Sequence, residues 1–221
     1  MKELLITIDG PAGAGKTTVS RSLAEKLGYA YVDTGALYRG VAYEAVQKGI
    51  SSTDDAALEN LCADIRLRVE KTAAGTRLFS GDTDISDKIR TPEMSMMASA
   101  VSARPVVRKA LLDIQRRLGA EKRAVFEGRD MGTVVFPDAD IKFFLTADLN
   151  ARAMRRHKEL LEASGQPLEA VAADMKRRDE NDASRDVAPL KPAPDAIIID
   201  STSLSAAEVV SEMMARVAAA S

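Results

Sequence analysis

The sequence is poor in the residues that build disulfide frameworks and metal clusters. Its 221 residues include one cysteine, Cys62, and one histidine, His157. A single thiol excludes an internal disulfide and a thiolate metal cluster, which fits a reducing compartment. His157 lies in a basic segment, where a solvated helix face is expected rather than a general base.

The chain also lacks a strong excess of charge and a long apolar run. The formal net charge is −2, so no overall positive field is available to hold a nucleic acid or an anionic membrane surface. No apolar run approaches the roughly 18 residues that cross a bilayer, and Leu4 to Ile8 is too short for a signal peptide. We therefore expect a cytoplasmic protein without nucleic-acid or membrane partners, and a monomer.

Short apolar segments alternate with longer amphipathic ones, which predicts an α/β fold with a parallel sheet flanked by helices. The length suits one domain and leaves room for an inserted subdomain. The five expected strands are Leu4 to Ile8, Ala30 to Val32, Ala124 to Glu127, Ile141 to Thr146 and Ala196 to Asp200. The expected helices are Lys16 to Leu27, Ala36 to Lys48, Pro92 to Ser102, Pro105 to Leu118 and a last helix from Ser205 toward Ala219.

Two segments depart from this alternation. Polar and apolar residues alternate over Arg66 to Glu70 and Arg77 to Ser80, with a turn signal at Ala74-Gly75, which predicts a small antiparallel insert. The stretch Asn150 to Arg185 is rich in basic side chains and has no strand-like run. It is typical of a pair of exposed helices, and we expect it to form a lid.

The strongest motif is a phosphate-binding loop between the first strand and the first helix. It fits the pattern G-x-x-x-x-G-K-[ST], and its residues are Gly10, Pro11, Ala12, Gly13, Ala14, Gly15, Lys16 and Thr17, followed by Thr18. Glycines let successive backbone N–H groups point at phosphates, and the following helix adds the positive end of its dipole. Lys16 is expected to reach the β- and γ-phosphates of ATP, and the Thr17 hydroxyl to ligate Mg²⁺.

The loop by itself does not identify the acceptor of the phosphoryl group, because several classes of enzyme share it. GTPases are excluded, since the sequence has no Asn-Lys-x-Asp tetrapeptide and no Asp-x-x-Gly after an apolar strand. Large motor ATPases need a longer chain. Compact kinases of small molecules remain.

Phosphoryl transfer requires fixed positive charge around the migrating group, and arginine supplies it in a planar, permanently charged form. Arg129 is the strongest candidate because it follows the strand that ends at Glu127, where open α/β sheets bind ligands. Glu127 is a candidate to orient the water shell of a metal, with a helix-start charge as the alternative. The other candidates, for each of which a solvated helix face is the alternative, are Arg39, Arg152, Arg155, Arg156, Arg178 and Arg185.

Together these motifs resemble the bacterial cytidylate kinases, over nearly the whole chain. The resemblance rests on the phosphate loop, on Asp33-Thr34-Gly35-Ala36-Leu37-Tyr38-Arg39, and on the highly specific string Gly128-Arg129-Asp130-Met131-Gly132-Thr133-Val134-Val135-Phe136-Pro137. It continues through Arg178 to Leu190 and Asp200-Ser201-Thr202.

The resemblance implies a P-loop nucleoside monophosphate kinase with three parts. These are a core (1–38, 105–149 and 190–221), a monophosphate-binding insert (about 39–104) and a lid (about 150–189). It also implies transfer of the γ-phosphate of ATP to CMP or dCMP with Mg²⁺. Lys16, Arg129 and Arg185 would then stabilise the charge of the transition state.

Individual roles are also implied by the resemblance. Ser99, Arg108 and Asp130 match the residues that read cytosine, whose N4 amine donor and N3 and O2 acceptors suit a carboxylate beside a guanidinium. Arg178 and Asp182 match the sugar-binding positions. Thr34, Arg39, Arg129 and Arg185 match those around the acceptor phosphate, and Arg152, Arg155 and Arg156 are expected to cover ATP.

Two positions depart from the family pattern. Thr34 and Glu127 stand where many members have Ser and Asp, and each keeps the functional group. The rival hypotheses are a kinase of another small acceptor, such as UMP or a sugar acid, and a binding module that holds ATP without transferring phosphate. Retention of Lys16 and Thr17 argues against the second.

Overall fold

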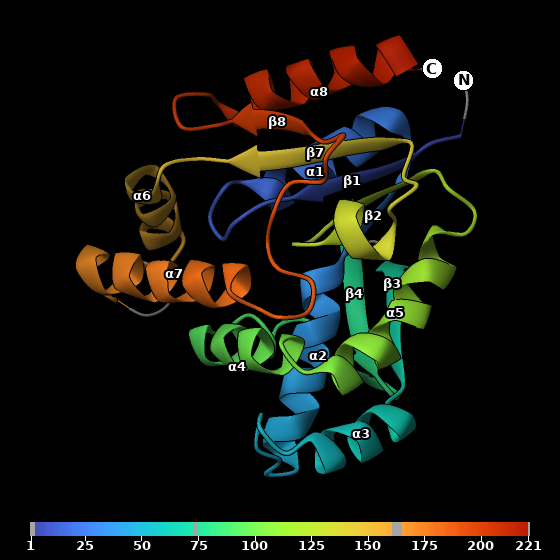
Figure 1. Ribbon diagram of the computed structural model, residues 1–221, viewed down its shortest axis with the longest axis vertical. Helices are drawn as coiled ribbons and strands as arrows, with labels where there is room; N and C mark the ends of the chain where they lie inside the picture. The colour runs from blue at the N-terminus through green and yellow to red at the C-terminus, as the bar shows by residue number, and fades with distance from the viewer. Residues whose placement is uncertain (1–2, 73–74, 161–164, 221) are drawn as a thin grey trace. The chain divides into compact units, whose positions relative to one another are not determined.

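The computed structural model describes residues 3–72, 75–160 and 165–220 (Figure 1). The chain forms two compact units, one made of Met1–Val32 with Gly119–Ser221 and the other of Asp33–Leu118. We call them the first unit and the second unit.

The first unit is built on a five-stranded sheet with the strand order β2-β6-β1-β7-β8. The strands are β1 (Leu5–Asp9), β2 (Ala30–Asp33), β6 (Ala124–Glu127), β7 (Ile141–Thr146) and β8 (Ile197–Asp200). Central strand β1 runs parallel to both β6 and β7 and is buried along its whole length. The predicted parallel α/β sheet is confirmed. Some strand ends lie one residue from their predicted positions, so that β1 ends at Asp9 rather than Ile8.

Helices α1 (Lys16–Leu27) and α8 (Ala206–Ala220) pack against this sheet (Figure 1). Both predicted helices are confirmed. Gly28 ends α1 in the left-handed conformation, with φ of 65°. Ser205 and Glu208 form the capping box expected before α8, because the Ser205 N–H and hydroxyl donate to Glu208 and the Glu208 N–H donates back to Ser205.

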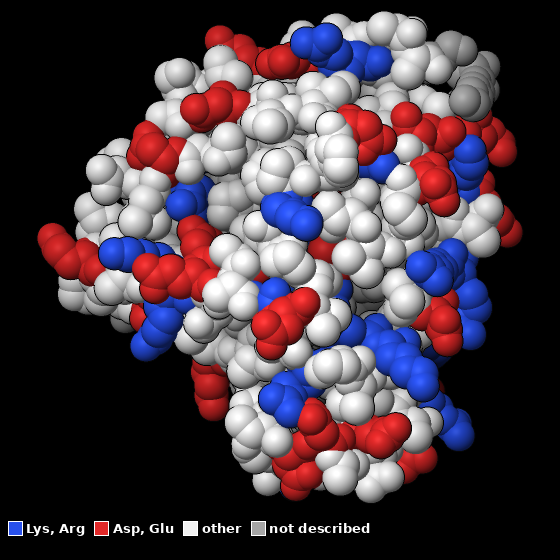
Figure 2. All heavy atoms as spheres, viewed as in Figure 1, with Lys and Arg blue, Asp and Glu red and all other residues white. Residues whose placement is uncertain are grey.

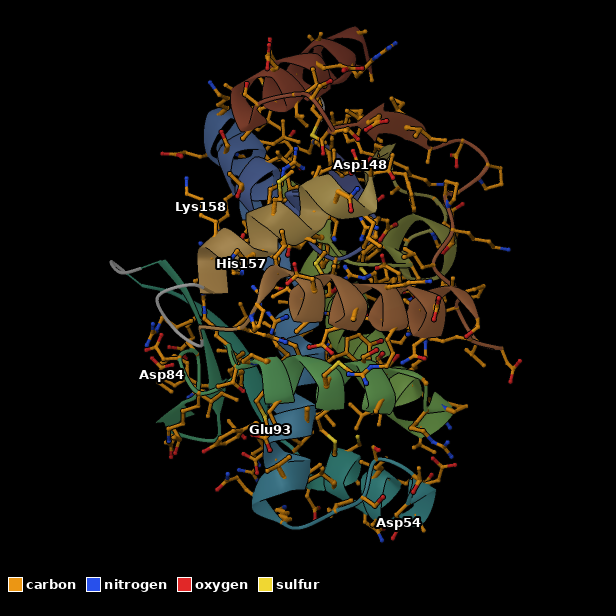
Figure 3. All side chains as sticks on the ribbon, turned by 90° about the vertical axis from the view of Figure 1, so that its left-hand side faces the viewer. Asp54, Asp84, Glu93, Asp148, His157 and Lys158 are labelled. Atoms are coloured by element: carbon orange, nitrogen blue, oxygen red, sulfur yellow. The ribbon has the colours of Figure 1, made fainter. Side chains whose placement is uncertain are left out.

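Two helices, the first of them rich in basic residues, follow β7 in the segment where we expect a lid. Helix α6 (Leu149–Leu160) is capped by Asp148, whose Oδ1 accepts from the Ala151 N–H at 2.8 Å. Figure 3 shows Asp148 at one end of α6, with His157 and Lys158 toward the other end. Helix α7 (Leu168–Ala183) packs on α6 through a small cluster of Ala153, Val171 and Met175.

The second unit contains four helices and a small antiparallel sheet among its described residues. They are α2 (Thr34–Gln47), α3 (Asp55–Asp64), β3 (Leu67–Thr72), β4 (Gly75–Ser80), β5 (Thr83–Asp84), α4 (Pro92–Ser102) and α5 (Pro105–Gly119, whose last residue belongs to the first unit). The sheet order β3-β4-β5 confirms the predicted antiparallel insert. Ala74 of the expected turn lies outside the described residues.

Helix α3 was missed in the sequence, as was a turn of π-helix, η1 (Met131–Val135), in the first unit. A signal for α3 was present, because Asp54 accepts from the Ala57 N–H and Leu58 and Leu61 then face the core. Asp54 is labelled in Figure 3.

The two units also differ from the predicted boundaries of core, insert and lid. Helix α5, expected in the core, buries Val107 and Leu111 in a cluster with Leu37, Val41 and other residues of the second unit. The lid helices belong to the first unit. The division into core, insert and lid therefore stays a prediction.

Charge on the surface is mixed, as the net charge of −2 suggests. Figure 2 shows Lys and Arg side chains interspersed with Asp and Glu over the face in view. None of the helices in the described part of the chain combines the length and apolar character that crossing a membrane requires.

Candidate active site

The phosphate-binding loop joins β1 to α1 through glycines that close packing makes necessary. Gly10 has φ of 147°, and a Cβ there would lie 1.9 Å from the carbonyl oxygen of Leu145 in β7. Gly13 has φ of 72°, and its Cβ would lie 2.6 Å from the Met175 side chain of α7. At Gly10 no side chain fits, and at Gly13 a side chain would have both a strained backbone and a displaced Met175.

Lys16 begins α1 and folds back over the loop. Its Nζ donates to the carbonyl oxygen of Pro11 at 2.7 Å, and the residue is 7% exposed. Burial lowers the pKa of Lys16 well below its ordinary value, and Arg129 and Arg178 act in the same direction. Glu127 and Asp9 oppose this shift. A buried ammonium that rests on a backbone carbonyl is well suited to exchange that partner for a phosphate.

Thr17, the second residue of α1, lies beside Glu127, the last residue of β6. The Thr17 hydroxyl donates to Oε1 of Glu127 at 2.8 Å, and Glu127 is 7% exposed. Two hard oxygen donors suit Mg²⁺, which keeps several waters and takes other ligands from phosphates. Among the described residues, no group of three or more acidic, histidine or cysteine side chains could hold a metal ion. The chemistry of the Thr17 and Glu127 pair fits a metal that takes its other ligands from a bound nucleotide and water.

Asp182, near the end of α7, gathers three of the predicted arginines. It is 1% exposed, and its Oδ2 lies 2.9 Å from Nε of Arg129 and 4.0 Å from Nε of Arg178. Arg185 pairs with the other carboxylate oxygen. Burial alone would raise the pKa of Asp182, but Arg129, Arg185 and Arg178 together outweigh it and lower this pKa.

The arrangement places three guanidinium groups around one carboxylate at the end of the sheet that carries the phosphate loop. A guanidinium has five N–H donors, so one that spends one or two on a carboxylate retains others for a ligand. Arg129 also acts on the pKa of Lys16, which shows that the cluster and the loop lie within electrostatic reach of each other. Such a set can bind a second phosphate near the first.

Asp9, the last residue of β1, is a buried carboxylate next to the phosphate loop that the sequence analysis did not single out. Its carboxylate is 4% exposed and accepts from the Met131 N–H at 2.9 Å and the Gly132 N–H at 2.8 Å. These amides directly follow Asp130, which is 2% exposed. The only sequence signal was an acidic residue at the end of an apolar strand, next to Gly10.

The three lid arginines have different surroundings. Arg152 is 7% exposed and donates to the carbonyl oxygens of Ala147 and Ala12 and to Asp179. Arg155 donates to the hydroxyl and carbonyl of Ser201, just after β8. Arg156 forms an ion pair with Glu159 one helical turn along α6. Arg152 therefore links the lid to the phosphate loop, and the predicted contacts of all three with ATP stay predictions.

In the second unit, Asp33 organises the start of α2. Its Oδ1 accepts from the Ala36 N–H at 3.0 Å and so caps the helix, while Oδ2 accepts from Arg39 Nη2 at 2.8 Å. The predicted phosphate ligand Thr34 is 1% exposed beside this cap. One carboxylate thus orients Arg39 and fixes the turn that carries Thr34.

Ser102 is hydrogen-bonded to both Ser99 and Arg108, two of the residues predicted to recognise the base. The Ser102 hydroxyl donates to the Ser99 carbonyl at 2.8 Å, and the Ser102 carbonyl accepts from Arg108 Nη1 at 3.3 Å. Arg108 is 8% exposed, and its guanidinium carbon lies 5.8 Å from the centre of the Tyr38 ring. The junction of α4 and α5 therefore holds Ser99 and Arg108 close to each other, while Asp130 belongs to the first unit.

Comparison with solved structures identifies the fold. The chain is similar to shikimate kinase from Acinetobacter baumannii in complex with shikimate, with a TM-score of 0.51, 15% identity, and 99% of this chain and 94% of that chain covered. It is also similar to shikimate kinase from Bacteroides thetaiotaomicron, with a TM-score of 0.51, 12% identity, and 97% and 98% covered. At these identities the likeness shows the P-loop kinase fold alone.

Comparison with sequences is more specific. A cytidylate kinase from Geobacter sulfurreducens is 48% identical over 212 residues, which is 95% of this chain and 91% of that protein. A cytidylate kinase from Halalkalibacterium halodurans is 44% identical, with 95% of both proteins covered. The family model described as cytidylate kinase matches residues 6–219. Because these matches span nearly the whole length, the chain belongs to the cytidylate kinase family.

Proposed function

We propose that this protein transfers the γ-phosphate of ATP to CMP and dCMP, giving ADP and the nucleoside diphosphate. The single observation that carries the proposal is the group of arginines around Asp182, within electrostatic reach of Lys16. A simple ATPase needs cationic groups for one polyphosphate, whereas a kinase of a phosphorylated acceptor needs a second set. Family membership favours CMP as that acceptor.

The proposed catalytic groups are Lys16, Arg129 and Arg185, which act by neutralising charge. The acceptor phosphate oxygen is already anionic, so no strong general base is required. Lys16 would leave the Pro11 carbonyl for the phosphates of ATP. Arg129 and Arg185, oriented by Asp182, would hold the acceptor phosphate and the migrating group in line.

Thr17 and Glu127 would hold Mg²⁺ with the nucleotide. When bound, the metal supplies charge neutralisation at the β- and γ-phosphates. The Thr17 hydroxyl would supply a direct ligand, and the adjacent Glu127 carboxylate would accept hydrogen bonds from the water shell.

The remaining proposed site residues bind the acceptor nucleotide or, in the lid, cover the bound ATP. Ser99, Arg108 and Asp130 would recognise cytosine, Arg178 and Asp182 the sugar, and Thr34 and Arg39 the phosphate. Uracil would place a carbonyl against the Asp130 carboxylate, which disfavours UMP. Lid arginines Arg152, Arg155 and Arg156 would cover ATP and exclude water. The proposal also includes that the protein is a monomer located in the cytoplasm.

The test is ADP release measured in parallel with CMP, dCMP, UMP and AMP as acceptors. We expect rapid turnover with CMP and dCMP and slow turnover with UMP. Lys16→Ala should depress kcat strongly with CMP binding largely intact, and full turnover by this variant would contradict the loop assignment. The control omits every acceptor, and ADP release at the same rate there would instead indicate an ATPase.

A binding module that holds ATP without transfer makes a different prediction. It would show an ATP-dependent increase in melting temperature but no ADP release with any acceptor. Formation of CDP excludes it.

A further inference from the structure

We propose that Asp9 is a positioning residue for the acceptor nucleotide, because its buried carboxylate holds the backbone turn that carries Asp130 and so sets the preference for cytosine over uracil. Asp9 is not expected to touch the substrate. The inference rests on the proposed function, in which Asp130 reads the base.

The first support is the geometry of the carboxylate. Each of its two oxygens takes one backbone N–H, Oδ1 from Met131 and Oδ2 from Gly132, at 2.9 and 2.8 Å. Two bonds from one planar group to consecutive amides fix both the position and the orientation of that backbone. The link connects positions 122 and 123 residues apart in the sequence, so it exists only in the folded protein.

The second support is the way in which η1 begins. The first N–H groups of any helical turn have no partner within the helix, so a capping side chain normally accepts from them. Asp130 occupies the N-cap position of η1, but its side chain makes no capping hydrogen bond. The carboxylate of Asp9 performs that function from the neighbouring strand.

The backbone of Asp130 is held on its other side as well. Its carbonyl oxygen accepts from the Val134 N–H at 2.9 Å and the Val135 N–H at 3.2 Å. The peptide groups after Asp130 are therefore restrained by Asp9 and by η1 together. Since a shift of a fraction of an ångström changes hydrogen bonding to a bound base, this restraint determines how well Asp130 can read the base.

The third support is the fixed position of Asp9 itself. It directly precedes Gly10, where the backbone packs so closely on Leu145 that no side chain fits. Strand β1 is the central strand of the sheet, with Asp9 paired to Phe144 of β7. The turn that carries Asp130 is thus held by the same strand end from which the phosphate loop starts.

Thr7 provides a matched comparison on the same face of β1. It is fully buried, and its hydroxyl has no hydrogen-bond partner among the residues that the structure describes. A Cβ built on Gly132 would lie 3.1 Å from this hydroxyl, so Thr7 packs against the same turn. Thr7 contacts the turn without holding its amides, and Asp9 holds them.

The experiment compares Asp9→Asn with Thr7→Val. Asn has nearly the same shape as Asp but presents an NH₂ group to one of the two amides and carries no charge. For each variant, kcat and KM are measured for CMP and UMP at saturating ATP, together with the melting temperature. We expect Asp9→Asn to reduce the CMP-to-UMP ratio of kcat/KM by roughly 10-fold or more, as for loss of a charged hydrogen bond. Thr7→Val should leave the ratio within about twofold.

An unchanged ratio in folded Asp9→Asn overturns the inference, whatever its melting temperature. If Asp9→Asn does not fold, Asp9→Glu tests the same point, because it keeps the charge but moves it by one methylene toward the turn. A wild-type ratio in Asp9→Glu with a shifted melting temperature would make Asp9 merely structural.

Failure of the proposed function has a separate signature. Asp130→Ala serves as the reference, because it should abolish the preference for CMP directly. If the wild-type protein makes no CDP, or if Asp130→Ala keeps the wild-type ratio, the proposed function itself is wrong. If the CMP-to-UMP ratio of kcat/KM falls in Asp130→Ala but keeps its wild-type value in Asp9→Asn, only the inference about Asp9 fails.

Discussion

Two of the buried carboxylates in the first unit, Asp9 and Asp182, have contrasting surroundings. Asp9, at the end of β1, accepts from two neutral backbone amides, and burial raises its pKa to about 6. Asp182, at the end of α7, is surrounded by Arg129, Arg185 and Arg178, which overcome burial and lower its pKa. The two amides and Lys16 offset only part of the cost of burying the Asp9 charge, to which the negative charge of Asp130 adds, whereas the three arginines around Asp182 offset all of that cost.

The contrast separates two uses of a buried charge. Asp182 is part of a charge cluster that must stay ionised to keep its arginines in place. Asp9 holds a backbone turn, and the ionised carboxylate it uses is costly to bury. The charged state of Asp9 therefore disfavours folding, while that of Asp182 favours it.

The largest expected effect comes from removing the Asp182 carboxylate. Asp182→Ala leaves the buried Arg185 and its neighbours without their shared counter-ion, which should cost about 3 to 5 kcal/mol in the free energy of unfolding. Urea denaturation of the variant and the wild type measures this loss. A loss below about 1 kcal/mol would mean that solvent screens the cluster and that the contrast with Asp9 does not hold.

The second effect concerns the dependence of stability on pH. Because the folded-state pKa of Asp9 lies at about 6, above its usual value of 3.8, the folded protein binds more protons between these values. The contribution of Asp9 to stability therefore falls as pH rises through this window, by on the order of 3 kcal/mol. Asp182 has the opposite sign, since its stabilisation is present above its usual pKa and is lost as pH falls below about 4.

Urea denaturation between about pH 4 and 7 tests this sign. The free energy of unfolding of Asp9→Asn should rise relative to the wild type as pH increases, because the variant lacks the buried charge. Thr7→Val, two residues earlier on the strand, should run parallel to the wild type. A difference between Asp9→Asn and the wild type that is constant with pH would contradict the assigned pKa shift.

A smaller effect is expected at the turn that Asp9 holds. Asp130→Ala should raise KM for CMP by roughly 10- to 150-fold, the value of a charged hydrogen bond of about 1.5 to 3 kcal/mol. Steady-state kinetics at saturating ATP measures it, with KM for ATP as the internal control. An unchanged KM for CMP would remove Asp130 from the base pocket.

The smallest effect on the free energy of unfolding is expected from removing a surface ion pair. Arg156 pairs with Glu159 on the surface of α6, so Arg156→Ala should change the free energy of unfolding by less than about 0.5 kcal/mol. The matched variant Arg152→Ala, which removes three hydrogen bonds of a side chain that is largely buried, should cost several times more. Equal losses in thermal denaturation would refute this distinction between buried and exposed arginines.

Local sequence signals accounted for most of the elements. Glycines ended helices, Thr91 with Pro92 began α4, and Ser205 with Glu208 capped α8, because these signals act within one helical turn. Helix α3 was missed although its cap was present, since only two of its residues, Leu58 and Leu61, are buried and its apolar pattern is weak. The π-helical turn η1 was missed because the carboxylate that accepts from its first two amides lies on another strand.

For the candidate site, too, the sequence predicted the contiguous motif but not the contacts between residues far apart in the chain. The phosphate loop could be predicted because the residues of the motif are consecutive and because such motifs bind phosphate through their backbone. The gathering of Arg129 and Arg185 on Asp182 was not deduced from the sequence, in which Arg129 lies 53 residues from Asp182. Family resemblance named those residues but not their mutual ion pairs.

The sequence by itself determined the parallel sheet, the phosphate loop and the positions of the basic helices, since each follows from periodicity or from a contiguous motif. Only the tertiary structure decided that Asp9 caps the turn after Asp130 and that Asp182 collects three guanidinium groups. The physical reason is that hydrogen bonds and charge pairs depend on distances of a few ångströms. Strand order and helix packing set those distances between residues far apart in the chain.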